Sequence, residues 1–169
     1  MANRILEFDP ITHITAGAIG QPGHRDFFIQ AMYGQDVVSL HCGIEQVLAL
    51  AEAIEEMLSN LEELGLKREL DLEIDEAMMA LKEPVDPLFR VGAMGLGYDV
   101  GRDRILLVAQ ELLDEEEGHE PLEVRFFATR AQMQALSMYA VQVVAGGRSP
   151  EQMALEAEIY ARRNGHGES

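Results

Sequence analysis

The chain has 169 residues, 47% of them hydrophobic, and its 13 basic and 30 acidic side chains give a formal charge of −17. This hydrophobic content is enough to bury a core at this length, which argues against a disordered chain. Nucleic acids and anionic membranes attract Lys and Arg, so the charge argues against both as partners. There is no apolar run of about 20 residues that would span a bilayer.

The N-terminal residues and the cysteine content indicate the cellular compartment. Residues 1–10 contain early charges and no secretory core, so we see no export signal there. A single cysteine, Cys42, excludes an intramolecular disulfide and a cysteine-rich zinc site. We therefore expect a cytoplasmic protein.

The first half predicts four strands followed by a helix. Short apolar stretches separated by turn residues predict strands over 5–8, 13–19, 26–32 and 36–41. Residues 43–64 then change to helical spacing, and Gly65 is a helix stop. The apolar stripe of this helix consists of Ile44, Val47, Leu48, Ala51, Ile54, Leu58 and Leu61. Residues 66–87 are interpreted chiefly as a connector, with 73–81 as a candidate short helix.

The second half repeats this succession. Strands are predicted over 89–98, 104–113 and 122–128, followed by a helix over 130–145 and a final helix over 150–163. The acidic run 114–120 between two of these strands lacks the alternating ligand spacing of a calcium loop, and we interpret it as a solvated charge run.

An internal repeat of residues 1–65 and 88–146 is the main structural prediction. GAIG at 17–20 matches GAMG at 92–95, and the strands 37–41 and 124–128 each lead directly into a helix. Thr129 and Gln132 form a capping box before the second helix, and Glu45 occupies the corresponding place in the first. We predict one α+β domain, in which duplicated strand–strand–strand–helix units form an antiparallel sheet or open barrel with helices packed on it and a C-terminal helix.

The glycine-rich turn over residues 17–25 is the best candidate for a binding site. Its candidate ligand-binding residues are Gly20, Gly23, His24 and Arg25, because backbone N–H groups in such turns bind anions and Arg25 or His24 adds positive charge. Known phosphate loops lead into a helix, whereas this one leads into a strand. Tight turning explains the glycines equally well.

Other candidate groups match no known motif. The spacings of His13, His24, His41 and Cys42 fit no zinc pattern, and a buried thiol is ordinary at a strand–helix junction. A thiol at a helix N-terminus can also act as a nucleophile, but no catalytic signature accompanies Cys42. We therefore predict no catalytic residues, no metal and no cofactor.

Three stretches carry a family resemblance. AGAIGQPGHRDFFIQA (16–31), DVVSLH (36–41) and FRVGAMGLGYD (89–99) resemble a bacterial family catalogued as a domain of unknown function, of the DUF3090 type. The resemblance covers about residues 3–148 and implies no established activity. Family members usually finish with a Cys-containing segment like a zinc knuckle, whereas residues 150–160 contain no cysteine, so no zinc role is carried over.

These observations leave three functions open. We expect a non-enzymatic cytoplasmic binding or adaptor protein with an unknown protein partner. The alternative is a protein that binds a small anionic ligand, a phosphate or a nucleotide, through residues 17–25, with enzymatic activity left open. A third reading is a self-assembling structural protein held together by its Met-bearing helices. The sequence does not decide the oligomeric state.

Overall fold

The computed structural model describes residues 4–21, 23–146, 158–159 and 161–162. Its labelled elements, in chain order, are β1 (Ile5–Phe8), β2 (His13–Ile19), β3 (Asp26–Tyr33), β4 (Asp36–Cys42), α1 (Ile44–Glu63), α2 (Glu76–Met79), β5 (Pro87–Asp99), β6 (Arg104–Glu111), β7 (Glu123–Ala128) and α3 (Arg130–Ala145). The predicted strands and the two long helices agree with these bounds to within two residues.

The α+β class is confirmed, with the strands in one open sheet of order β1-β7-β6-β5-β4-β3-β2. Pairing is antiparallel within β2-β3-β4 and within β5-β6-β7, as expected. The pairs β4–β5 and β1–β7 are parallel, which the strand patterns did not predict. A parallel neighbour requires a crossover connection, and α1 with the connector after it supplies one between β4 and β5.

The two edges of the sheet approach each other at the link between β1 and β2. The Ile11 N–H donates to the Phe127 carbonyl on β7, and the next N–H, that of Thr12, donates to the Met32 carbonyl on β3. The Phe8 ring packs against Tyr33 and Phe126, each with its centroid 5.6 Å away. The sheet is therefore strongly curved without closing into a barrel.

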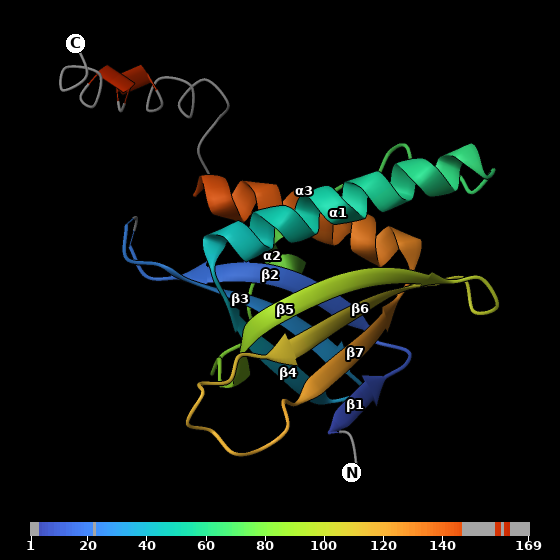
Figure 1. Cartoon of the computed structure of the whole chain (residues 1–169). Coiled ribbons are helices and arrows are strands. Elements are labelled where there is room, and N and C mark those ends of the chain that lie inside the picture. Colours follow the sequence, from blue (N-terminus) through green and yellow to red (C-terminus); the bar gives the residue numbers. More distant parts are fainter. Residues whose placement is uncertain (1–3, 22, 147–157, 160, 163–169) are drawn as a thin grey trace.

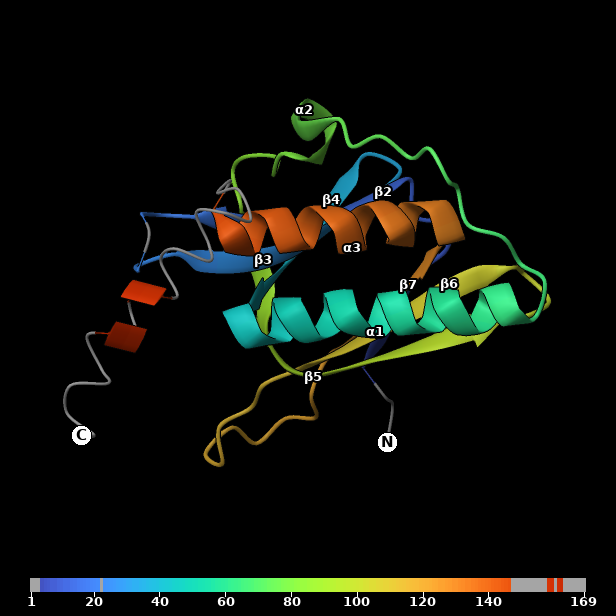
Figure 2. The same ribbon diagram turned by 90° about the horizontal axis from the view of Figure 1, so that it is seen from above.

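Helices α1 and α3 lie side by side in antiparallel directions on one side of the sheet (Figures 1 and 2). The capping box predicted for α3 is confirmed, because Gln132 N–H donates to Thr129 Oγ1 at 3.0 Å and Thr129 N–H to Gln132 Oε1 at 2.8 Å. For α1 the returning residue is Gln46, whose Oε1 accepts from Gly43 N–H at 2.8 Å. The expectation of Glu45 in that role was wrong by one position.

The buried face of α1 is narrower than its apolar stripe. Val47, Ala51, Ile54, Leu58 and Leu61 are buried as the spacing predicts, together with Leu50. Ile44 and Leu48 belong to the same predicted stripe, yet they remain 42% and 37% exposed. The core therefore leaves part of the apolar surface of α1 uncovered.

The connector crosses the outer strands of the sheet and is held there by two buried side chains. Thr15 Oγ1 donates to the carbonyl of Met79, the last residue of α2, at 2.6 Å. Gln30 exchanges hydrogen bonds with the Lys82 backbone, donating from Nε2 at 3.1 Å and accepting at Oε1 at 2.8 Å. The predicted short helix within 73–81 is confirmed as α2, which is one turn long.

Other predictions extend beyond these observations. The elements β2-β3-β4-α1 and β5-β6-β7-α3 succeed one another in the same order, and the internal repeat of 1–65 and 88–146 stays a prediction. Most of the predicted helix 150–163 lies outside the described residues, where only 158–159 and 161–162 are placed, in helical conformation. In the described part of the chain, no helix combines the length and the apolar character that a bilayer span needs.

Candidate functional site

The predicted glycine-rich turn forms the end of β2 and the connection to β3. Gly20 and Gly23 adopt positive φ angles of 112° and 90°, which L side chains rarely adopt. A Cβ on Gly20 would lie 2.5 Å from the His24 carbonyl oxygen. The His24 N–H donates to the Gln21 carbonyl at 2.9 Å and closes the turn. Backbone geometry thus accounts for both glycines.

The Arg25 side chain reaches the C-terminus of α3 instead of an open loop. Its Nη1 donates to the Val143 carbonyl at 3.1 Å and its Nη2 to the Val144 carbonyl at 3.4 Å. Its guanidinium carbon also lies 5.5 Å from the centroid of the Phe27 ring. A cation at this end of a helix is favourable because the last carbonyls carry partial negative charge. Arg25 therefore joins the turn to α3.

A pocket of about 460 Å³ adjoins this turn. It is lined by Gly17, Ala18, Ile19, Gly20, Arg25, Glu76, Ala80, Leu81, Glu83, Tyr139, Gln142, Val143 and Gly146. Burial and the nearby Glu76 raise the pKa of the Tyr139 hydroxyl. Of the four predicted residues, Gly20 and Arg25 line this pocket, whereas Gly23 and His24 are exposed and do not.

The histidines and the cysteine considered as metal ligands are not brought together as a set. Within the described residues, no three-donor group includes His13, His24, His41 or Cys42. His41 pairs with Asp26 at 3.2 Å and stacks on Phe28. Burial raises the pKa of the Cys42 thiol to about 12. That environment opposes the thiolate that nucleophilic catalysis and metal binding require.

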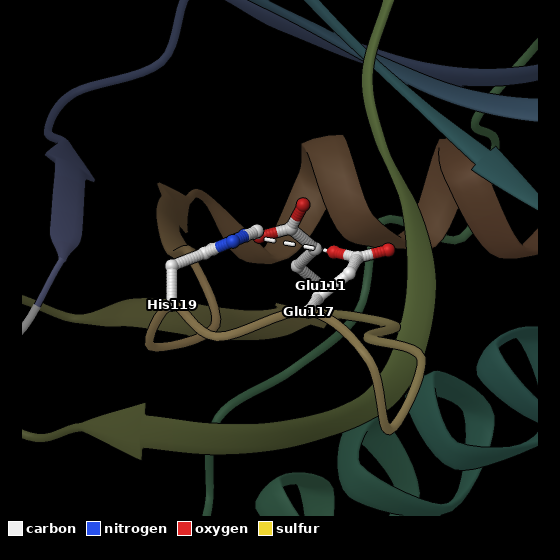
Figure 3. A group of neighbouring side chains, drawn as sticks. All are labelled: Glu111, Glu117 and His119. Carbon is white, nitrogen blue, oxygen red and sulfur yellow. Dashed lines mark ion pairs between the residues drawn. The ribbon is translucent and has the colours of Figure 1, made fainter.

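A different trio does bring potential ligands together. Glu111 at the end of β6, with Glu117 and His119 in the following loop, place one donor atom each within 4.8 Å of one another (Figure 3). His119 Nε2 lies 3.5 Å from Glu111 Oε1 and 3.7 Å from Glu117 Oε2. Residues 114–120 were predicted to be a solvated charge run, and Glu111 was not among the predicted site residues. The loop joins two strands that pair with each other, and it therefore returns to the end of β6, where Glu111 lies.

The outer side of the two-helix layer contains a groove of about 640 Å³. It is lined by Leu48, Ala51, Glu52, Glu55, Glu56 and Ser59 of α1 and by Ser137, Met138 and Val141 of α3. Met138 is 39% exposed and Val141 50% exposed, in addition to Leu48. Helical spacing places Leu48 in the apolar stripe of α1, and it does not predict this surface.

An open, mixed sheet of seven strands with two antiparallel helices on one side defines the chain as an α+β domain. Comparison with known proteins then gives its family. The family described as "Protein of unknown function (DUF3090)" matches residues 6–154, and the chain belongs to it, which confirms the resemblance. No curated protein and no solved structure matches the chain.

Proposed function

We propose that this protein is a non-enzymatic binding or adaptor protein whose α1–α3 groove holds an amphipathic helix with basic flanks from a partner protein. The observation that carries the proposal is the exposed apolar strip formed by Leu48, Met138 and Val141 on the solvent side of both helices. Exposed apolar surface of this kind is a common mark of an interaction site.

The floor of the groove suits a dry contact. Ala51 and Ser137 lie beneath the exposed residues and are 3% and 7% exposed. The Ser137 hydroxyl donates to the Ala51 carbonyl at 2.9 Å, so its one donor hydrogen is already bonded between the two helices. A partner covering this floor therefore leaves neither group without a hydrogen bond, and the cost of burying unpaired polar atoms is avoided.

The charges around the groove favour a basic partner. Helix α1 contains six glutamates and no basic residue, and Glu52, Glu55 and Glu56 line the groove. Arg68 pairs with Glu55 at 2.6 Å, whereas Glu52 and Glu56 make no ion pair within the described part of the chain. Lys or Arg flanking the apolar residues of a partner would meet these two carboxylates. Such complementarity mainly sets specificity and the association rate.

The length of the surface suits a helix. Helix α3 has 16 residues, which corresponds to about 24 Å along its axis. Two antiparallel helices with an apolar seam form the kind of groove in which a third amphipathic helix lies, with anchors at spacings of three and four residues. We also propose a cytoplasmic location, which the buried free thiol of Cys42 supports.

The test uses two synthetic helical peptides of about 18 residues with the same Leu anchors at helical spacing. One carries Lys at the other positions and the second carries Glu. We expect the Lys peptide to bind in fluorescence anisotropy and the Glu peptide not to bind. Val141→Ser in the groove should weaken binding by about tenfold, since an apolar anchor contact is lost without a change of charge. The matched control is Val100→Ser, because Val100 is 81% exposed and lies outside the groove.

Two results would overturn this proposal. Equal affinity of the Lys peptide for the wild type, Val141→Ser and Val100→Ser would show that the acidic surface attracts it without the groove. A dimer in sedimentation velocity that Val141→Ser dissociates would assign the groove to a second copy of the chain. Circular dichroism of each variant checks that the fold is retained.

The alternative, an anionic ligand at residues 17–25, is favoured by the pocket that Gly20 and Arg25 line. It ranks second because the Arg25 guanidinium already donates to two helix carbonyls, and the carboxylates of Glu76 and Glu83 line the same pocket. A titration with inorganic phosphate followed by NMR tests it. Shifts confined to residues 17–25 would support the alternative, and unchanged spectra would count against it.

A further inference from the structure

The trio at the β6–β7 loop differs from the acidic residues around it by its imidazole. Glu111 ends β6, and Glu117 and His119 lie in the loop that returns to β7, so the three side chains converge from two separate segments (Figure 3). Carboxylate oxygen and imidazole nitrogen together form a donor set typical of Zn²⁺ and similar transition metals.

The spacing of the donor atoms suits a shared cation. His119 Nε2 lies 3.5 Å from one carboxylate oxygen and 3.7 Å from the other, beyond the usual 2.7–3.2 Å of an N–H···O hydrogen bond. In a tetrahedral site, two ligands are separated by about 1.6 times the metal–ligand distance. With Zn–N and Zn–O distances of about 2.0–2.2 Å, that separation is about 3.3–3.6 Å. The two observed distances lie within or close to this range.

One of the three ligands is already positioned by the backbone. Glu111 Oε1 accepts from the Leu122 N–H at 3.1 Å, and the Glu111 N–H donates to the Leu122 carbonyl at 2.8 Å. The side chain of Glu111 is only 20% exposed, whereas those of Glu117 and His119 are 38% and 46% exposed. A fixed carboxylate at the base and two accessible ligands above it allow a cation to enter from solvent.

The surroundings favour a divalent cation further. Residues 114–120 contain five acidic side chains and no Lys or Arg. Their summed field lowers the free energy of a dication at the loop and offsets part of its lost hydration. In the described residues, this is the group in which three such donors come together.

We propose that Glu111, Glu117 and His119 bind one Zn²⁺ ion, through one oxygen of each carboxylate and Nε2 of His119, with water in the remaining position. An imidazole ligand selects against Mg²⁺ and Ca²⁺, which prefer oxygen-only sites. Binding would join the loop to the end of β6, so the expected role is to order the β6–β7 loop. The inference is independent of the α1–α3 groove.

Isothermal titration calorimetry of the full chain with ZnCl₂ tests the proposal. We expect one ion per chain, no comparable heat with MgCl₂, and affinity lowered by about tenfold or more in His119→Ala and Glu117→Gln. The matched controls are Glu115→Gln, in the same loop, and His24→Ala, an exposed histidine on the β2–β3 connection. Both should bind like the wild type. NMR adds a readout of place, because Zn²⁺ should shift the ring resonances of His119 first.

Each contrary result is decisive. Absence of binding at micromolar Zn²⁺ would overturn the proposal, as would one-site binding that survives His119→Ala. Loss of binding in His24→Ala would place the ion elsewhere. A Glu115→Gln effect as large as that of Glu117→Gln would show that Zn²⁺ responds only to the charge of the loop. All four variants change exposed side chains, so folding should be retained, and circular dichroism checks it.

Discussion

Replacement of Arg25 by alanine tests whether this side chain stabilises the fold or is available to bind a ligand. The change removes two charge-assisted hydrogen bonds, to the carbonyls of Val143 and Val144, and the contact with the Phe27 ring. A cation at a partly buried helix C-terminus contributes up to about 2 kcal/mol, and a cation–π contact about 0.5–1 kcal/mol. Because these contributions overlap and Arg25 is only half-buried, we expect a loss of about 2 kcal/mol in the free energy of unfolding.

The assay is urea unfolding followed by circular dichroism, with thermal unfolding as a second measurement. A loss of about 2 kcal/mol corresponds to a Tm lower by about 4–8 °C for a domain of this size. Arg25→Lys should lose about half as much, since the charge stays and the paired donors do not. His24→Ala is the control and should stay within about 0.5 kcal/mol of the wild type. A loss below about 0.5 kcal/mol in the free energy of unfolding of Arg25→Ala would refute this structural role. Arg25 would then again be a candidate ligand-binding residue.

Three further outcomes follow from buried or paired groups. Arg130 and the Tyr98 hydroxyl bond to Asp103 and lower the pKa of its carboxyl to about 2. The stabilisation is therefore present above the unfolded pKa of about 3.9 and is lost as the pH falls towards 2. Allowing for solvent screening, it amounts to about 1 kcal/mol. Urea unfolding should therefore separate Asp103→Asn from the wild type at pH 6 and not at pH 2. A Cβ at buried Gly17 would overlap the Leu81 side chain, so Gly17→Ala should cost about 1–3 kcal/mol, and a Leu81→Ala background should reduce that cost. The Cys42 thiol, buried and with its pKa raised to about 12, should react with a thiol reagent only after urea unfolding; rapid reaction of the native chain would contradict this.

The sequence predicted the elements well because each carried a local signal. Alternation and turn residues mark the strands, and the Thr129–Gln132 box marks the start of α3. The parallel pairs β4–β5 and β1–β7 left no such signal, since strand pairing across the chain depends on how the two halves meet. Periodicity identified the apolar stripe of α1, but its boundary on the solvent side is set by where α3 lies.

The candidate sites show the same limit. The glycines of residues 17–25 attracted attention because glycine-rich turns bind phosphate, yet positive φ angles explain Gly20 and Gly23, and Arg25 turns towards α3. Glu111 lies six residues before Glu117, outside the acidic run, and only the return of the loop to the strand end brings the two together. A site whose residues are brought together only by the fold shows no motif of regular spacing in the sequence.

The acidic composition can therefore be divided by position. Glu52, Glu55 and Glu56 of α1 line an apolar groove on the outer side of the helix layer. Glu111 ends β6 and Glu117 lies in the loop between β6 and β7, which Figure 1 shows away from the two helices. Coupling between two distant sites requires a structural element that both sites share and that has two arrangements. Within the described residues, no hydrogen bond or ion pair joins the trio of Glu111, Glu117 and His119 to α1 or α3. The two proposals therefore stand or fall separately. A peptide that binds the groove should not need Zn²⁺, and the trio should bind Zn²⁺ with the groove empty.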